Sequence, residues 1–193
     1  GFDGKIYIGG YFTNAGGIAT ADYITRWTGS AYESITASGA ADGAVYTLAI
    51  SRVGHLYAGG GFTTINGVST NYIARYDGTN WNTVVSATGL NGDVYDIIPD
   101  PWGDGVIIAG AFQNVGGTER DYLLRVKITG TTYTYELVGG GTPNGAVHSM
   151  AYDPQSGRLY VQGAFTAIGT GYNLQMDANY VAYYDGSSWR PLG

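Results

Sequence analysis

The sequence contains no cysteine, and only 12 % of its 193 residues are charged. The absence of cysteine excludes a disulfide-stabilised scaffold, a thiolate metal site and a cysteine nucleophile. Lysine and arginine number 9 against 15 aspartates and glutamates, and the net charge is -6. Because nucleic acids and anionic membranes attract basic surfaces, this balance argues against both as partners. No apolar run approaches the roughly 18 residues of a membrane span, so we expect no membrane insertion.

What the sequence does contain is a repeat. Glycine is abundant, with 33 residues, and tyrosine follows with 18. Four phenylalanines recur at intervals of about 50 residues. They are Phe12, Phe62, Phe112 and Phe165. We interpret residues 1–193 as one domain of four repeats, at approximately 1–43, 44–92, 93–145 and 146–193.

Each repeat contains four short segments with the composition of β-strands. They are rich in Val, Ile, Tyr and Trp and are bounded by Gly, Asn, Asp or Ser. In the second repeat they lie at residues 44–48, 56–60, 72–76 and around Trp81. Helical periodicity is absent, and glycine at this density would destabilise helices. Four strands in a repeat of this length predict an all-β fold, a β-propeller of four-stranded antiparallel blades.

The best-matching repeat also resembles a known family. It reads Gly-Gly-x-Phe-Thr at residues 59–63 and Ile-Ala-Arg-Tyr-Asp-Gly-x-x-Trp at residues 73–81. This pattern resembles the kelch-type repeat and, more closely, the repeats of Rax2-like propellers. The third repeat departs from it most, because it lacks the double glycine, the Asp-Gly turn and the tryptophan. The resemblance implies a propeller fold and is unspecific for activity, since propellers host many unrelated functions.

The kelch strand order would make residues 44–48 the innermost strand of a blade. The first blade would then lack its inner strand, and the chain would hold about 15 blade strands. Three interpretations follow. The chain is a piece of a longer propeller of about five to eight blades, or it forms a four-bladed ring that closes imperfectly, or it completes a ring or filament with other chains. Because the sequence starts at Gly1 in strand-like sequence, we interpret it as a processed or excised piece.

We do not expect the two histidines to bind a metal or to take part in catalysis. His55 and His148 both occupy positions that the other repeats fill with structural residues, and a zinc site needs three or four converging ligands. His148 replaces Tyr46 and Tyr95, which predicts an aromatic position inside a blade. We expect no metal and no cofactor.

Carboxylates gather between the second and third repeats, as Asp93, Asp96, Asp100 and Asp104. Asp100 and Asp104 flank a turn, and we expect a turn role for them. Asp96 stands where Thr47 and Ser149 stand in other repeats, so it departs from the pattern. On an inner strand it would face the central channel, where a pair of carboxylates could hydrolyse glycosidic bonds. Calcium, which prefers oxygen ligands, is a weaker option because no EF-hand spacing is present.

Three arginines recur, each preceded four residues earlier by Asp or Asn. The pairs are Asp22 with Arg26, Asn71 with Arg75, and Asp121 with Arg125. Because residues i and i+4 of a strand share a face, we expect each pair to bond within its blade. The alternative is a ring of ligand-binding arginines, against which stands Tyr183, the residue that replaces the arginine in the fourth repeat.

The fourth repeat contains an insertion after Phe165. This loop is about five residues longer than its equivalents, and insertions in repeat proteins often map to a binding face. The candidate binding residues are Tyr172, Asn173, Leu174 and Met176. The alternative is that the loop covers a blade edge.

These features favour a non-catalytic structural or recognition module that binds a protein or carbohydrate surface. The Lys-poor composition, rich in Gly, Thr, Ser, Tyr and Asn, indicates a secreted, filament or virus-particle surface protein, and thus an extracellular or particle-surface location. One alternative is a carbohydrate-active hydrolase that uses channel carboxylates such as Asp96. Another is an assembly protein whose open first blade is completed by a neighbouring chain, as an oligomer.

Overall fold

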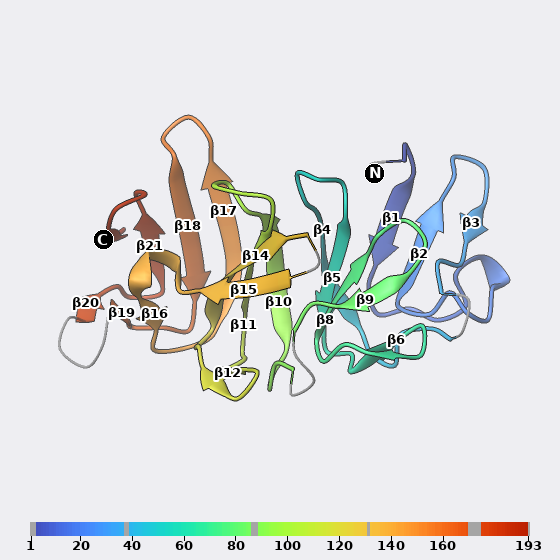
Figure 1. Ribbon diagram of the computed structural model, residues 1–193, viewed down its shortest axis with the longest axis horizontal. Coiled ribbons are helices and arrows are strands. Elements are labelled where there is room, and N and C mark those ends of the chain that lie inside the picture. Colours follow the sequence, from blue (N-terminus) through green and yellow to red (C-terminus); the bar gives the residue numbers. More distant parts are fainter. Residues whose placement is uncertain (1–2, 37–38, 86–88, 131, 170–174, 193) are drawn as a thin grey trace.

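The regular structure of the chain is almost entirely β-strand (Figure 1). The computed structural model describes residues 3–36, 39–85, 89–130, 132–169 and 175–192. Within these ranges, three sheets have four strands in consecutive antiparallel order and a fourth has three, which confirms the predicted architecture and the incomplete first blade. The blades are β1 (Ile6–Gly9), β2 (Ile24–Trp27) and β3 (Tyr32–Glu33); β4 (Val45–Ile50), β5 (Leu56–Gly60), β8 (Ile73–Tyr76) and β9 (Trp81–Thr83); β10 (Val94–Pro99), β11 (Val106–Gly110), β14 (Leu123–Thr129) and β15 (Thr132–Glu136); and β17 (Val147–Asp153), β18 (Arg158–Gly163), β21 (Val181–Tyr184) and β22 (Trp189–Pro191).

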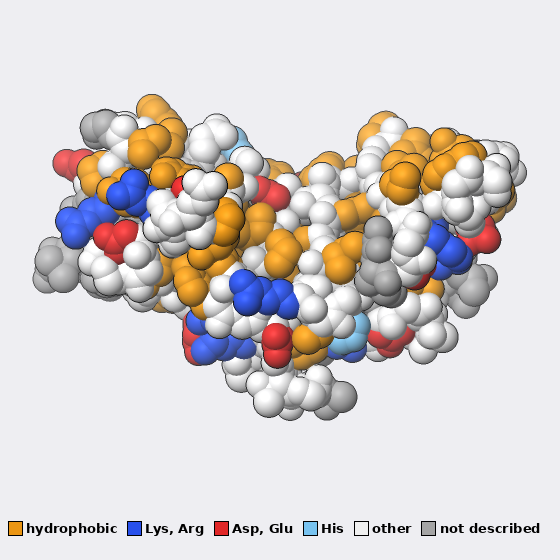
Figure 2. Space-filling model, turned by 90° about the horizontal axis from the view of Figure 1, so that it is seen from above, with side chains coloured by type: hydrophobic (Ala, Val, Ile, Leu, Met, Phe, Trp, Pro, Cys, Tyr) orange, Lys and Arg blue, Asp and Glu red, His pale blue; other side chains and the backbone are white. Residues whose placement is uncertain are grey.

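The blades follow one another along an open arc. The inner strands are neighbours, with β10 between β4 and β17, and β1 lies beside β4. The first and fourth blades lie at opposite ends of the long axis (Figure 1), and the view from above is hollowed between two lobes (Figure 2). The described blades therefore form an open arc rather than the imperfectly closed four-bladed ring that was one of the three interpretations.

Each middle blade buries both of its faces. Successive side chains of a strand point to opposite faces, and β11 shows the result. Val106 and Ile108 join a core shared with the second blade, whereas Ile107 and Ala109 join a core shared with the fourth. A third core lies between the first and second blades. The cores thus lie between blades.

No described residue covers the face of the first blade that points away from the second. Ile6 on β1 is 59 % exposed, whereas Leu56, which has the same position on β5, is 1 % exposed. Leu56 packs in the core shared with the preceding blade, whereas the described residues offer Ile6 no such core.

Short strands that the sequence did not predict lie in the connections between blade strands. Between the second and third strands of a blade lie β6 (Thr64–Ile65), β7 (Val68–Ser69), β12 (Asn114–Val115), β13 (Thr118–Glu119), β19 (Ala167–Gly169) and β20 (Gln175–Asp177), with a 3-10 turn at Ala15–Gly17 in the first blade. A 3-10 turn at Val138–Gly140 and β16 (Thr142–Pro143) lie between the third and fourth blades, and β16 pairs with β19. Asx side chains before each inner strand hold these hairpins. Asn91 Oδ1, for example, accepts bonds from the N–H groups of Gln113 (2.7 Å) and Asn114 (2.9 Å), and Asp42 and Asn144 bond in the same way.

A tyrosine with left-handed backbone precedes the third strand of every blade. The φ angles of Tyr23, Tyr72, Tyr122 and Tyr180 are 63°, 74°, 62° and 67°. This conformation costs a non-glycine residue about 1–2 kcal/mol. Both polar backbone groups of such a tyrosine are hydrogen-bonded. In the third blade, the Tyr122 N–H donates to Phe112 O (2.8 Å) and the Tyr122 carbonyl accepts a bond from Gly110 N (3.0 Å). The alternation of side chains is interrupted at this residue, which matters for the arginines that follow.

Glycines at the end of each second strand provide a test of the blade order. A Cβ on Gly60 would collide with the carbonyl oxygen of Ala44, and one on Gly110 with that of Asp93, because the inner strand passes there. Gly10 has the same position in the first blade, but only the Phe12 ring lies within 4 Å of its Cβ position.

We expect Gly110→Ala to lower the free energy of unfolding by about 1–3 kcal/mol, since backbone must move to accommodate the methyl group. Gly10→Ala should change it by less than about 0.5 kcal/mol. Urea unfolding of dilute protein measures both. Equal losses in the two variants would contradict the strand order.

Candidate functional site

The inner strands place a row of aromatic rings on the surface. Each inner strand begins with a β-bulge, where the pairing register shifts between Val45 and Thr47, Val94 and Asp96, and Val147 and Ser149. The extra residue in each bulge is Tyr46, Tyr95 or His148. The ring centroids of Tyr46 and Tyr95 are 6.2 Å apart, and those of Tyr95 and His148 are 5.5 Å apart. We call these three side chains the inner aromatic row.

The predicted position of His148 inside a blade is wrong. The side chain is exposed, as is Tyr46, which is 52 % exposed. The reason is the bulge, because the extra residue is left out of the pairing and its side chain is redirected. The signal in the sequence was the aromatic that follows Asp/Asn-Gly-x-Val in three repeats, at residues 42–46, 91–95 and 144–148.

Asp96 lies on inner strand β10, next to this row, and links three blades. Its Oδ2 accepts a bond from the Met150 N–H of the fourth blade (2.6 Å), and its Oδ1 accepts one from Thr47 Oγ1 of the second (3.5 Å). Thr47 Oγ1 in turn accepts a bond from Ile97 N (3.2 Å). Both oxygens of the Asp96 carboxylate are therefore used by inter-blade bonds.

Asp100 has the expected turn role and a second one. Its backbone N–H donates to Gly105 O (3.0 Å) and its Oδ1 accepts a bond from the Trp102 N–H (2.9 Å). Its side chain is 0 % exposed, and Oδ2 lies 2.7 Å from Arg125 Nε. The turn thus carries a buried ion pair to β14. Asp104 is exposed.

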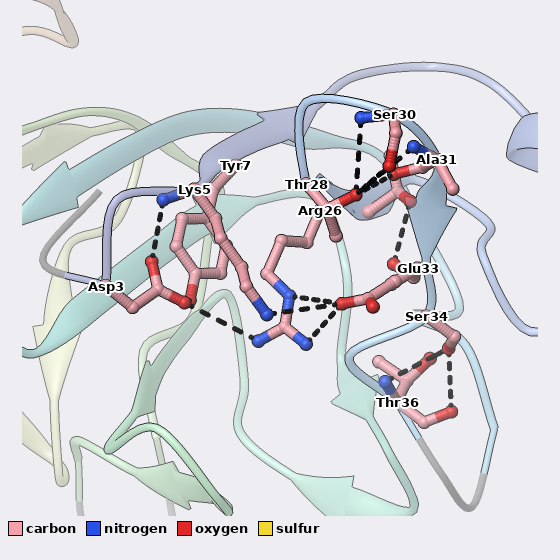
Figure 3. A network of polar contacts seen from close by, with 11 residues as sticks. Asp3, Lys5, Tyr7, Arg26, Thr28, Ser30, Ala31, Glu33, Ser34 and Thr36 are labelled. Atoms are coloured by element: carbon pink, nitrogen blue, oxygen red, sulfur yellow. Dashed lines mark hydrogen bonds and ion pairs between the residues drawn. The ribbon is translucent and has the colours of Figure 1, made fainter.

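The predicted partners of Arg26 and Arg125 are wrong. Arg26 pairs with Glu33 (2.6 Å) and Asp3 (3.7 Å), and Figure 3 shows Lys5 pointing to the same Glu33 carboxylate. Arg125 pairs with Asp100 and, at 3.5 Å, with Glu136.

The physical reason is the left-handed tyrosine between the i and i+4 residues, which breaks the strand geometry that the prediction assumed. Asp22 instead accepts a bond from the Asn14 N–H (2.6 Å). The Arg26 side-chain hydrogen bond lowers the pKa of Glu33 below its usual value.

Two grooves lie between blades, next to the outer strands. The groove between the third and fourth blades has a volume of about 280 Å³ and is lined by Trp102, Arg125, Glu136, Leu137, Val138, Gly139, Tyr184 and Gly186. The groove between the second and third blades has a volume of about 530 Å³ and is lined by Arg75, Asn82, Thr83, Val84, Val85, Tyr133 and Tyr135. Sequence reasoning missed both, because each is formed by two consecutive repeats.

The residues of the insertion are only partly described. Tyr172, Asn173 and Leu174 lie outside the described residues, and Met176 lies in β20 but its side chain is not described. Their assignment to a binding site stays a prediction. In the described part of the chain, no group of three or more His, Asp or Glu side chains could hold a metal ion. No helix in the same residues is long and apolar enough to cross a membrane.

The comparison with known proteins supports the fold. A family described as "Domain of unknown function (DUF5122) beta-propeller" matches residues 3–21 and 54–81. These stretches include β1 and most of the second blade from β5 to the start of β9. No curated protein matches the chain. With the four-stranded sheets, the family match identifies the chain as a β-propeller repeat protein.

The Asp100–Arg125 pair can be tested against the less buried Arg26–Glu33 pair, whose side chains are 19 % and 41 % exposed. Asp100→Asn removes the charge that faces Arg125 in a buried position, and we expect a loss of about 3 kcal/mol in the free energy of unfolding. Glu33→Gln should cost less, at most about 1 kcal/mol, because solvent reaches this pair and screens it. Thermal and urea denaturation at neutral pH measure both variants. A smaller loss for Asp100→Asn than for Glu33→Gln would show that the buried pair is not important for stability.

Proposed function

We propose that the chain is a non-catalytic recognition or structural module whose inner aromatic row contacts a protein or carbohydrate partner. A tyrosine ring buries apolar area while its hydroxyl forms a hydrogen bond, so such rings suit both kinds of surface. The observation that carries the proposal is the contrast at the bulges. The rings of Tyr46 and His148 are exposed, whereas the neighbouring Asp96 carboxylate is bonded to two other blades.

We also propose a location for the protein and further contact residues, both from the sequence. We assign the chain to a secreted, filament or virus-particle surface protein, on the basis of its composition and the resemblance to kelch-type and Rax2-like repeats. Tyr172, Asn173, Leu174 and Met176 are proposed as further contact residues.

Glycan-array binding and hydrolysis assays with three proteins test this function. Wild type and Asp96→Asn should give the same binding profile, because the asparagine Oδ1 still accepts the Met150 N–H. Tyr95→Ala should weaken binding to the same glycans, since it removes the central ring of the row. Neither wild type nor Asp96→Asn should release sugar. Hydrolysis by wild type that is lost in Asp96→Asn would instead establish the hydrolase.

The open edge of β1 favours assembly as a second candidate function. In the other blades, the N–H groups of Gly61, Ala111 and Ala164 donate to the inner strand at 3.0, 2.9 and 2.7 Å. The equivalent N–H of Tyr11 has no such bond in the described residues, and Gly10 beside it leaves room for a strand. We propose that an inner-strand segment of a neighbouring chain, antiparallel to β1, fills this place.

Light scattering over a range of concentrations tests the assembly. Wild type should form oligomers, and Gly10→Val should remain monomeric because its side chain would occupy the path of the added strand. Thr132→Val, at an exposed position of the outer strand β15, serves as a substitution control outside the edge and should still oligomerise. A wild-type protein that stays monomeric at every concentration would contradict strand donation.

A further inference from the structure

Arg75 differs from its counterparts in the other repeats because it lacks an acidic partner. In the paired strands, Arg26 faces Glu33 and Arg125 faces Glu136, whereas Arg75 faces Asn82. The turn before the second strand also differs, since Ser51 has the position of Asp100. In the described part of the chain no carboxylate lies within ion-pair distance of Arg75. The second repeat has thus kept the cation and replaced both of the anions.

The guanidinium of Arg75 lies in the wall of the groove of about 530 Å³ between the second and third blades. Asn82 and Thr83 come from β9, and Tyr133 and Tyr135 from β15. The Arg75 Cζ is 5.7 Å from the centre of the Tyr133 ring. The Tyr135 hydroxyl donates to Val84 O (3.0 Å), which holds that ring in place. We call this the Arg75 groove.

Several polar atoms beside the groove have no protein partner. Arg75 Nε, Tyr133 Oη and Tyr57 Oη are buried, and none has a hydrogen bond within the described residues. Tyr57 is paired with Arg75 in the sheet. Burial raises the pKa of Tyr57 and of Tyr133, so both phenols remain protonated donors. Burial lowers the pKa of the nearby His55, whose Nδ1 also lacks a partner, so that ring is neutral near pH 7.

The carboxylate of Asp77 lies near Arg75 but is hydrogen-bonded to other groups. Asp77 is close enough to Arg75 for the guanidinium to contribute to its lowered pKa. Its Oδ1 accepts bonds from the N–H groups of Thr79 and Asn80, and its Oδ2 accepts one from the Asn82 amide. The Asp77 carboxylate is therefore fixed in the β8–β9 turn and does not neutralise Arg75 directly.

We propose that the Arg75 groove binds an acidic saccharide, with the sugar carboxylate on the Arg75 guanidinium. A guanidinium presents two parallel donors that match a carboxylate. The rings of Tyr133 and Tyr135 offer apolar faces to the sugar ring, while Thr83 can bond to its hydroxyl groups. The groove between the third and fourth blades is not expected to bind such a carboxylate, because its arginine, Arg125, is already paired with Asp100 and Glu136.

This inference extends the proposed function and rests on it only in treating the chain as a binding module. It adds a second site, at the outer side of the blades, that does not use the inner aromatic row.

The first and third repeats indicate which substitution would pair Arg75 internally and so test whether its unpaired state is needed for binding. Asn82→Glu places opposite Arg75 the residue that the first and third repeats carry, so the arginine gains an internal partner, while the Asn82 amide bond to Asp77 Oδ2 is lost. Asn82→Gln has almost the same size without the charge and is the matched control. Calorimetric titration with trigalacturonic acid should show binding to wild type and Asn82→Gln. Asn82→Glu and Arg75→Gln should bind about tenfold more weakly or worse, a difference of about 1.4 kcal/mol.

Two further ligands show whether binding requires the carboxylate and whether it requires the sugar ring. The methyl ester of trigalacturonic acid has the same rings without the charges and should bind at least about tenfold more weakly than the acid. Equal binding of acid and ester, or equal binding of the acid to Asn82→Glu and wild type, would overturn the proposal. Triglutamate binding to wild type more tightly than trigalacturonic acid would overturn the assignment to a saccharide.

Failure of this inference can be told apart from failure of the proposed function. If trigalacturonic acid does not bind to wild type, the Arg75 site is wrong. Array binding of other glycans that is lost in Tyr95→Ala and kept in Arg75→Gln would then still support the inner aromatic row.

Discussion

The structure depends on the need to cover both faces of a four-stranded sheet. Every residue of β11 is buried, and alternate side chains enter the cores on its two sides. A fully buried Leu or Ile contributes about 1.5–3 kcal/mol relative to its exposed state, so a middle blade would lose several kcal/mol of stability if one of its faces were left in water. Stacking consecutive repeats solves this for the middle blades. It also places polar grooves between blades, where the outer strands diverge from the cores.

Much of the fold could be predicted from the sequence, because burial and turn chemistry repeat with the chain. The spacing of Phe62 and Phe112 gave the repeat, and the apolar and aromatic segments gave four strands and an incomplete first blade. The hairpins β6–β7 and β12–β13 could not be predicted in this way. Their strands are two residues long and leave no periodicity, and they are held by Asp42 and Asn91 from the end of the preceding repeat.

The site was harder to predict, because it depends on single backbone conformations and on pairs of repeats. Asp96 stood out as a departure from the pattern, but its bonds to Thr47 and Met150 N could only be seen once the inner strands were side by side. The arginine partners were mispredicted because left-handed tyrosines break the strand periodicity. Arg75 could be singled out only together with Arg26 and Arg125, because it obeys the repeat; the change that distinguishes it is its cross-strand partner, Asn82.

Consecutive repeats stack face to face in an open arc. Methyl NOESY spectra of protein labelled at Ile, Leu and Val test this arrangement. Ile108 should show cross-peaks to second-blade methyls such as Ile73, and Ile107 to fourth-blade methyls such as Leu159, with none between the first and fourth blades. Cross-peaks between the first and fourth blades, or the absence of those between consecutive repeats, would contradict the stacked arc.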